Sequence, residues 1–63
     1  MEFADKVKYV RKQLNLSQEK LASLLGVSFA TVNRWETGHS MPIYKTQQSF
    51  NALCKENNIK FEE

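Results

Sequence analysis

Two short helical patterns joined by a three-residue connection constrain this chain more than any other feature. They fill residues 17–38, and the connection is Gly26-Val27-Ser28. Ser17 and Ser28 are suitable N-caps, because a serine hydroxyl accepts a hydrogen bond from an orphan amide of the first helical turn. Gly26 tolerates the left-handed conformation that a tight helix end needs. The first pattern carries an apolar stripe at helical spacing, made by Leu16, Leu21, Leu24 and Leu25.

This stretch predicts a helix-turn-helix, in which the second helix can lie in the major groove of DNA. Ala22 is small where the two helices meet, and Val32 fills the angle between them. On a helical wheel Val32 and Trp35 face the core. The opposite, outward set consists of Phe29, Ala30, Asn33, Arg34 and Thr37. An αα-hairpin with no nucleic-acid partner is the alternative that the same spacing leaves open.

The length and the remaining patterns predict one all-α domain over residues 1–63. We expect a compact bundle of four short helices, or five, followed by a short extended tail. Apolar residues repeat at helical spacing from Phe3 to Leu14, and a face of Phe50, Leu53 and Cys54 is predicted to be buried. Alternation at residues 59–62 is typical of a short strand. The expected bounds are helices at about 2–14, 18–25, 28–37 and 44–57, and a tail at 58–63.

Charge is distributed unevenly along the chain. The formal net charge is only +2 and the pI is about 8.9, which is just below the range usual for nucleic-acid-binding domains. Residues 6–45 nevertheless hold seven basic side chains and two acidic ones, a net charge of +5. Positive charge therefore collects around the helix-turn-helix, which favours a nucleic-acid partner over a neutral mixed surface.

Several other classes of function lack their residues here. No apolar run approaches the roughly 20 residues of a membrane span, and the N-terminus does not read as a signal peptide. The single cysteine, Cys54, excludes an internal disulfide and fits a reducing cytoplasmic setting. His39 stands alone, without a second ligand at metal spacing. Nothing resembles a nucleophile–base pair or a phosphate-binding loop. We therefore expect no catalytic site, metal, cofactor, small-molecule substrate or membrane partner.

The chain resembles the phage repressor and Cro type of helix-turn-helix, also called the xenobiotic-response-element family. The likeness extends over about residues 3–54, most of the sequence. It is carried by residues 17–22 (SQEKLA), 26–28 (GVS) and 31–38 (TVNRWETG), followed by Pro42. The resemblance implies a cytoplasmic, nucleoid-associated protein that binds double-stranded DNA. The tail departs from the family's frequent fifth helix, which is used for dimerisation, so only a weak homodimer on DNA is left open.

The resemblance and the wheel together assign roles to individual residues. The base-reading set is Phe29, Ala30, Asn33 and Arg34. In this set a phenyl ring can contact a thymine methyl, arginine can read guanine, and asparagine can read adenine or hold a phosphate. Core packing for Phe29 and a phosphate contact for Arg34 remain open. The set assigned to the DNA backbone is Gln18, Ser28, Thr37, His39, Ser40 and Lys45. The resemblance implies this role for Gln18 and for the loop that begins at His39. It also implies a partly buried ion pair between Arg11 and Glu36.

Sequence-specific DNA binding and a role in bacterial or phage transcriptional regulation are the favoured hypothesis. Two alternatives remain. The chain could be the DNA-targeting domain of a larger enzyme, such as a methylase or helicase. It could also be a protein-interaction domain that keeps the fold without binding DNA, in which case Phe29 would be a protein contact.

Overall fold

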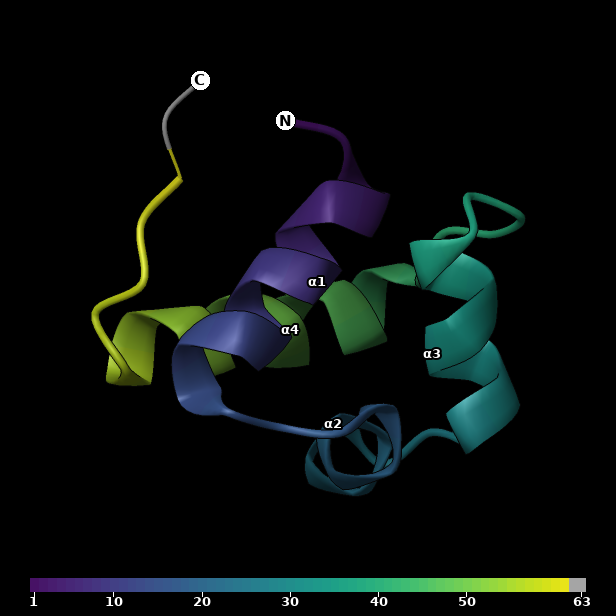
Figure 1. Cartoon of the computed structure of the whole chain (residues 1–63), viewed down its shortest axis with the longest axis horizontal. Coiled ribbons are helices and arrows are strands. Elements are labelled where there is room, and N and C mark those ends of the chain that lie inside the picture. Colours follow the sequence, from purple (N-terminus) through teal and green to yellow (C-terminus); the bar gives the residue numbers. More distant parts are fainter. Residues whose placement is uncertain (62–63) are drawn as a thin grey trace.

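A computed structural model describes residues 1–61 and shows an all-α bundle, as predicted (Figure 1). The helices are α1 (Phe3–Leu14), α2 (Gln18–Leu25), α3 (Phe29–Glu36) and α4 (Tyr44–Glu56). Each helix begins and ends within one residue of its expected bound. The described part therefore contains four helices, without the fifth helix or the short strand that the sequence left open.

Local hydrogen bonds explain where the two central helices begin and end. The Ser17 hydroxyl accepts from the Lys20 amide at 3.0 Å, and the Ser28 hydroxyl accepts from the Thr31 amide at 3.1 Å. Each cap satisfies one of the orphan donors of a first turn. Gly26 has φ +70°, a left-handed conformation that ends α2 at little cost because glycine has no Cβ. The sharp connection thus follows directly from its residue types.

All four helices contribute to one core. Its buried side chains are Val7, Val10, Leu21, Ala22, Leu25, Val32, Trp35, Phe50 and Cys54. Phe3 packs edge-on against both Trp35 and Phe50, with ring centroids 5.6 and 5.2 Å apart. Such edge-to-face pairs add to the burial of apolar area. The core therefore fixes the inward face of α3, and with it the direction in which the opposite face points.

Two details of the apolar pattern were predicted wrongly or incompletely. Leu24 is 51% exposed and does not belong to the stripe that buries Leu21 and Leu25. The buried face of α2 is therefore narrower than the apolar spacing suggested. Leu53 is only partly buried, although it packs against the core.

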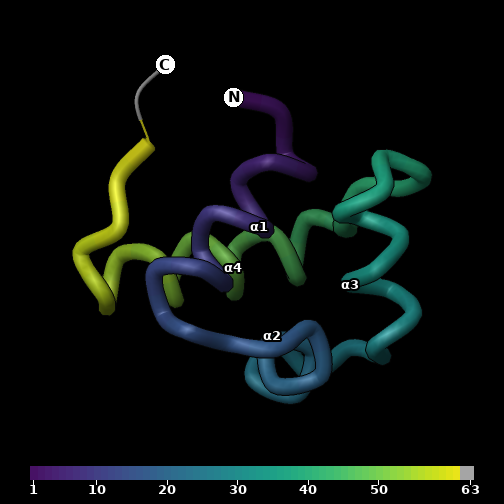
Figure 2. Tube along the Cα trace, viewed as in Figure 1, coloured from purple at the N-terminus to yellow at the C-terminus, as the bar shows by residue number. Residues whose placement is uncertain are grey.

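The described part of the C-terminal tail, residues 58–61, packs back onto the bundle. The traces in Figures 1 and 2 show it rising beside α1, near the N-terminus. The Phe61 ring lies 5.8 Å from the Tyr9 ring, and the Lys6 ammonium lies 5.2 Å above it. Ile59 and Phe61 both pack against the core while residues 59–61 form no strand, because no second strand lies beside them to pair with. Glu62, the end of the alternating pattern, lies outside the described residues.

Candidate nucleic-acid interface

The end of α3 is tied to α1 by a nearly buried ion pair. Arg11 donates from Nε to Glu36 Oε2 at 2.5 Å and from Nη2 to Glu36 Oε1 at 2.9 Å. Arg11 Nη1 also donates to the Leu16 carbonyl at 3.1 Å, in the connection between α1 and α2. A two-pronged contact of this kind fixes orientation as well as distance. One guanidinium therefore positions α1, the α1–α2 connection and α3 relative to one another.

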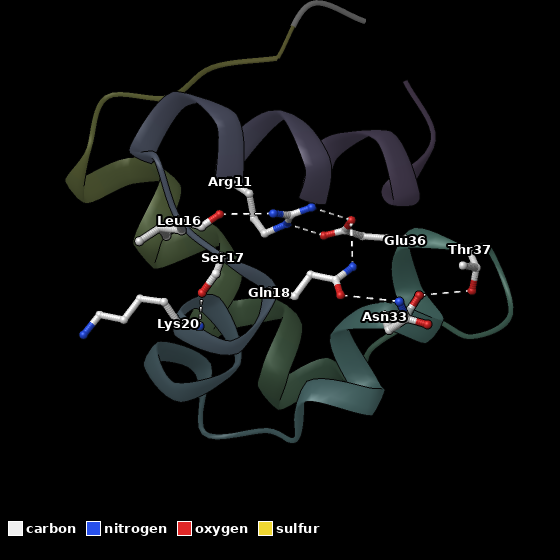
Figure 3. Close-up of polar contacts among 8 residues, drawn as sticks. All are labelled: Arg11, Leu16, Ser17, Gln18, Lys20, Asn33, Glu36 and Thr37. Carbon is white, nitrogen blue, oxygen red and sulfur yellow. Dashed lines mark hydrogen bonds and ion pairs between the residues drawn. The ribbon is translucent and has the colours of Figure 1, made fainter.

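A second link carries this network to the outward face of α3 (Figure 3). Gln18, the first residue of α2, donates from Nε2 to Glu36 Oε1 at 3.1 Å. Its Oε1 accepts from Asn33 Nδ2 at 3.4 Å, the longest contact of the network. The four side chains thus form a continuous polar chain from Arg11 through Glu36 and Gln18 to Asn33. This chain lies where the first turn of α2 crosses the second half of α3.

The electrostatics of the network favour an ionised Glu36. Burial alone would raise the pKa of this carboxyl. The hydrogen bonds from Arg11 and Gln18, together with the charges of Arg11 and Lys8, outweigh burial and hold the pKa below its usual value. The hydrogen bonds with Glu36 in turn raise the pKa of Arg11. The pair is consequently charged at neutral pH, and its carboxylate can only accept hydrogen bonds.

The outward face of α3 is open to solvent, as the helical wheel predicted. Phe29, Ala30, Asn33 and Arg34 are all exposed. The Phe29 side chain is 51% exposed, so its ring is not a member of the buried core. On the opposite face Val32, Trp35 and Glu36 are buried. One side of the helix is therefore open to solvent, and the other side holds the helix against the bundle.

The residues assigned to the DNA backbone lie at helix ends and in the α3–α4 loop. Ser28, Thr37, His39 and Lys45 are exposed, while Ser40 is partly buried. The Thr37 hydroxyl donates to the Asn33 or Arg34 carbonyl, at 3.0 and 3.2 Å, and lies 2.8 Å from His39 Nδ1. The Ser28 hydroxyl is 2.8 Å from that of Thr31. These short contacts restrain the side chains on either end of α3.

Comparison with known proteins decides the family. The family model described as helix-turn-helix matches residues 7–43, which include α2, α3 and most of α1. The chain belongs to the helix-turn-helix family. This match confirms the resemblance drawn from residues 17–38, and it ends just before α4.

A relative places the family match in a wider context. Over all 63 residues the chain is 33% identical to a protein of Enterococcus faecalis named HTH-type transcriptional activator BcrR. The chain spans 29% of the length of that relative. No solved structure matches the chain significantly.

Three contacts of this polar network were not predicted from the sequence. They are the bond from Arg11 to the Leu16 carbonyl, the bond from Gln18 to Glu36, and the bond between Asn33 and Gln18. Asn33 and Glu36 are three residues apart, so they share one side of α3. That spacing was a signal that both could face the start of α2. The crossing angle that brings Gln18 between them could not be read from spacing.

The described residues carry few groups suited to other chemistry. Residues 1–61 contain no group of three or more histidine, cysteine, aspartate or glutamate side chains that could hold a metal ion. Burial raises the pKa of the Cys54 thiol, so the protonated form predominates and nucleophilic reactivity is low. Within the same residues no helix is long and apolar enough to span a bilayer.

Proposed function

We propose that the chain binds double-stranded DNA sequence-specifically, with α3 in the major groove, and that it serves transcriptional regulation without catalytic activity. One observation carries this proposal. The exposed side of α3 presents an arginine, an asparagine, an alanine and a half-exposed phenyl ring, while the buried side is locked to α1 and α2. A rigidly held helix with an open, chemically varied face is what groove recognition needs.

Each residue of that face has a role that its chemistry supports. Arg34 would donate to guanine O6 and N7, and Asn33 would pair with adenine. Phe29 would contact a thymine methyl, while Ala30 would let the helix approach the bases closely. Contacts to base edges carry sequence information, whereas contacts to phosphates set register and affinity.

The backbone contacts would surround this face. We assign them to Gln18, Ser28, Thr37, His39, Ser40 and Lys45. Support comes from their positions, which lie at the first turns of α2 and α4, at both ends of α3 and in the loop after it. The net charge of +5 over residues 6–45 would favour the approach of a phosphate backbone. A weak homodimer formed only on DNA remains part of the proposal.

The family and the name of the Enterococcus faecalis relative, a transcriptional activator, support the proposed regulatory role. Because the chain spans 29% of that relative, its activity as a whole protein is transferred here only as a proposal.

Salt dependence tests whether the chain binds DNA at all. The affinity for a duplex of random sequence should fall steeply between 50 and 200 mM salt. The log–log slope should be about −0.9 for each phosphate contacted. Fluorescence anisotropy of a labelled duplex measures this slope. Binding that is absent at low salt, or that does not respond to salt, would refute DNA binding and favour a protein-interaction domain.

Site selection from a random DNA pool then tests sequence reading. Arg34→Ala should weaken binding to the selected site by about 1–3 kcal/mol and relax the preference at one base pair. Lys45→Ala is the matched control, since a lost phosphate contact should weaken the selected and scrambled duplexes by similar factors. If Arg34→Ala also weakens both duplexes equally, the arginine holds a phosphate and does not read a base.

A further inference from the structure

The hydrogen bonds that lead from Glu36 through Gln18 to Asn33 have a fixed order of donors and acceptors. This order bears on the base that Asn33 can prefer. We propose that Gln18 is a positioning residue that fixes which way the Asn33 carboxamide faces, and that it thereby sets the base preference at the position Asn33 contacts. This inference rests on the proposed DNA binding. It goes beyond that proposal because it gives a role in specificity to Gln18, which is not one of the proposed base-reading residues on α3.

The order of donors and acceptors is set first by the buried Glu36 carboxylate. An ionised carboxylate has acceptors only, so Glu36 requires a donor from each partner. Arg11 supplies two, and Gln18 supplies its Nε2 amine at 3.1 Å. Rotating the Gln18 carboxamide by half a turn would bring its carbonyl oxygen against the carboxylate. That arrangement is repulsive, so Gln18 has one permitted orientation.

The same constraint passes from Gln18 to Asn33. With the Gln18 amine directed at Glu36, its Oε1 faces α3 and accepts from Asn33 Nδ2 at 3.4 Å (Figure 3). A flipped Asn33 would place two carbonyl oxygens in contact. Asparagine on an open surface has no such preference, since both orientations can bond to water. Asn33 is exposed. Its carboxamide nevertheless has one orientation, because Gln18 fixes it and the buried Glu36 carboxylate fixes Gln18.

The groups that remain free on Asn33 determine what it can read. They are its Oδ1 acceptor and the second hydrogen on Nδ2. Adenine offers a donor at N6 and an acceptor at N7 in the major groove, whereas guanine offers acceptors at both O6 and N7. A carboxamide with a fixed donor and a fixed acceptor matches adenine and leaves its oxygen opposed to an acceptor of guanine. A carboxamide that flips freely discriminates less, because it can turn its amine toward guanine.

One test of the orientation needs no DNA. In Gln18→Met the side chain keeps its length and loses both hydrogen bonds. We expect the Asn33 side-chain amide signals in the nitrogen–proton NMR spectrum to shift toward those of Asn51, an exposed asparagine on α4. Gln13→Met is the matched control, because Gln13 is an exposed glutamine near the end of α1. If the Asn33 amide signals do not move in Gln18→Met, the positioning role is wrong.

The second test uses the selected site with each of the four base pairs at the Asn33 position. That position is the one at which Asn33→Ala relaxes preference. Gln18→Met should lower the preference for adenine over guanine there by about fivefold or more, in addition to the uniform weakening on every duplex that loss of its phosphate contact would give. Equal weakening on all duplexes would overturn the inference and leave Gln18 as a phosphate contact only.

The two proposals can fail separately. A wild-type chain that binds no duplex at low salt would refute both the proposed function and the base-preference claim, while the NMR comparison would still decide the orientation of Asn33. Normal DNA binding with an unchanged adenine preference in Gln18→Met would refute only the inference.

Discussion

The ion pair between Arg11 and Glu36 yields an asymmetric prediction. The Arg11 side chain is 25% exposed, whereas that of Glu36 is only 5% exposed. In Arg11→Ala a buried carboxylate would keep only the Gln18 hydrogen bond, so we expect a loss of about 3–4 kcal/mol in the free energy of unfolding. In Glu36→Ala the guanidinium can turn toward water and keep the Leu16 carbonyl, so we expect a loss of about 1–2 kcal/mol.

Urea unfolding followed by circular dichroism measures these losses. A domain of 63 residues should have a total stability of about 3–9 kcal/mol, so Arg11→Ala could be largely unfolded in plain buffer. An excluded osmolyte such as sucrose, added equally to every sample, restores the native baseline. The double variant should lose less unfolding free energy than the two single losses added together, by about 1–2 kcal/mol. Lys12→Ala and Glu19→Ala, at exposed neighbouring positions, should each change stability by less than about 0.5 kcal/mol.

Two results would contradict this reasoning. Strict additivity of the two single losses would mean that the residues do not interact. A larger loss in Glu36→Ala than in Arg11→Ala would mean that burial of the carboxylate does not set the cost, and that side-chain packing in the last turn of α3 does.

Three further predictions concern stability in acid, the exposed side of α3 and the C-terminal tail. The folded-state pKa of Glu36 is lowered, so the ionised carboxylate stabilises the fold above the unfolded pKa of about 4.3. This stabilisation is lost as the pH falls through the folded-state pKa. In urea unfolding between pH 7 and 3, Glu36→Gln should therefore lose less stability on acidification than the wild type does. Phe29→Ala should reduce preference at a thymine in the binding assay and leave the unfolding temperature within a few degrees, whereas a sharp drop would place the ring in the core. Phe61→Ala should lower the unfolding temperature, because it removes the ring contact with Tyr9 and the cation contact with Lys6, and an unchanged temperature would show that the tail adds no stability.

The sequence predicted the fold well because its local signals agree with its global ones. Serine caps, a left-handed glycine and apolar spacing each pointed to the same two helices around residues 26–28. The exposure of Phe29 followed from the wheel, since its opposite face had Val32 and Trp35 to bury.

What escaped prediction depends on how the helices cross. Leu24 has the spacing of a buried residue but is 51% exposed, because which side of α2 is buried depends on the neighbouring helices and not on spacing alone. The contact between Gln18 and Asn33 joins residues on different helices, so no periodicity within one helix could reveal it. The roles of the outward residues in binding remain predictions, because they depend on a partner.

Trp35 gives this domain a built-in optical reporter. It is the single tryptophan of the sequence, and its side chain is 2% exposed. It precedes Glu36, its ring centroid lies 5.6 Å from that of Phe3, and it faces away from the exposed side of α3. Its fluorescence should therefore register separation of α1 from α3, and should be nearly insensitive to DNA that docks on the other side. Emission and anisotropy from one sample would then distinguish loosening of the bundle from loss of binding.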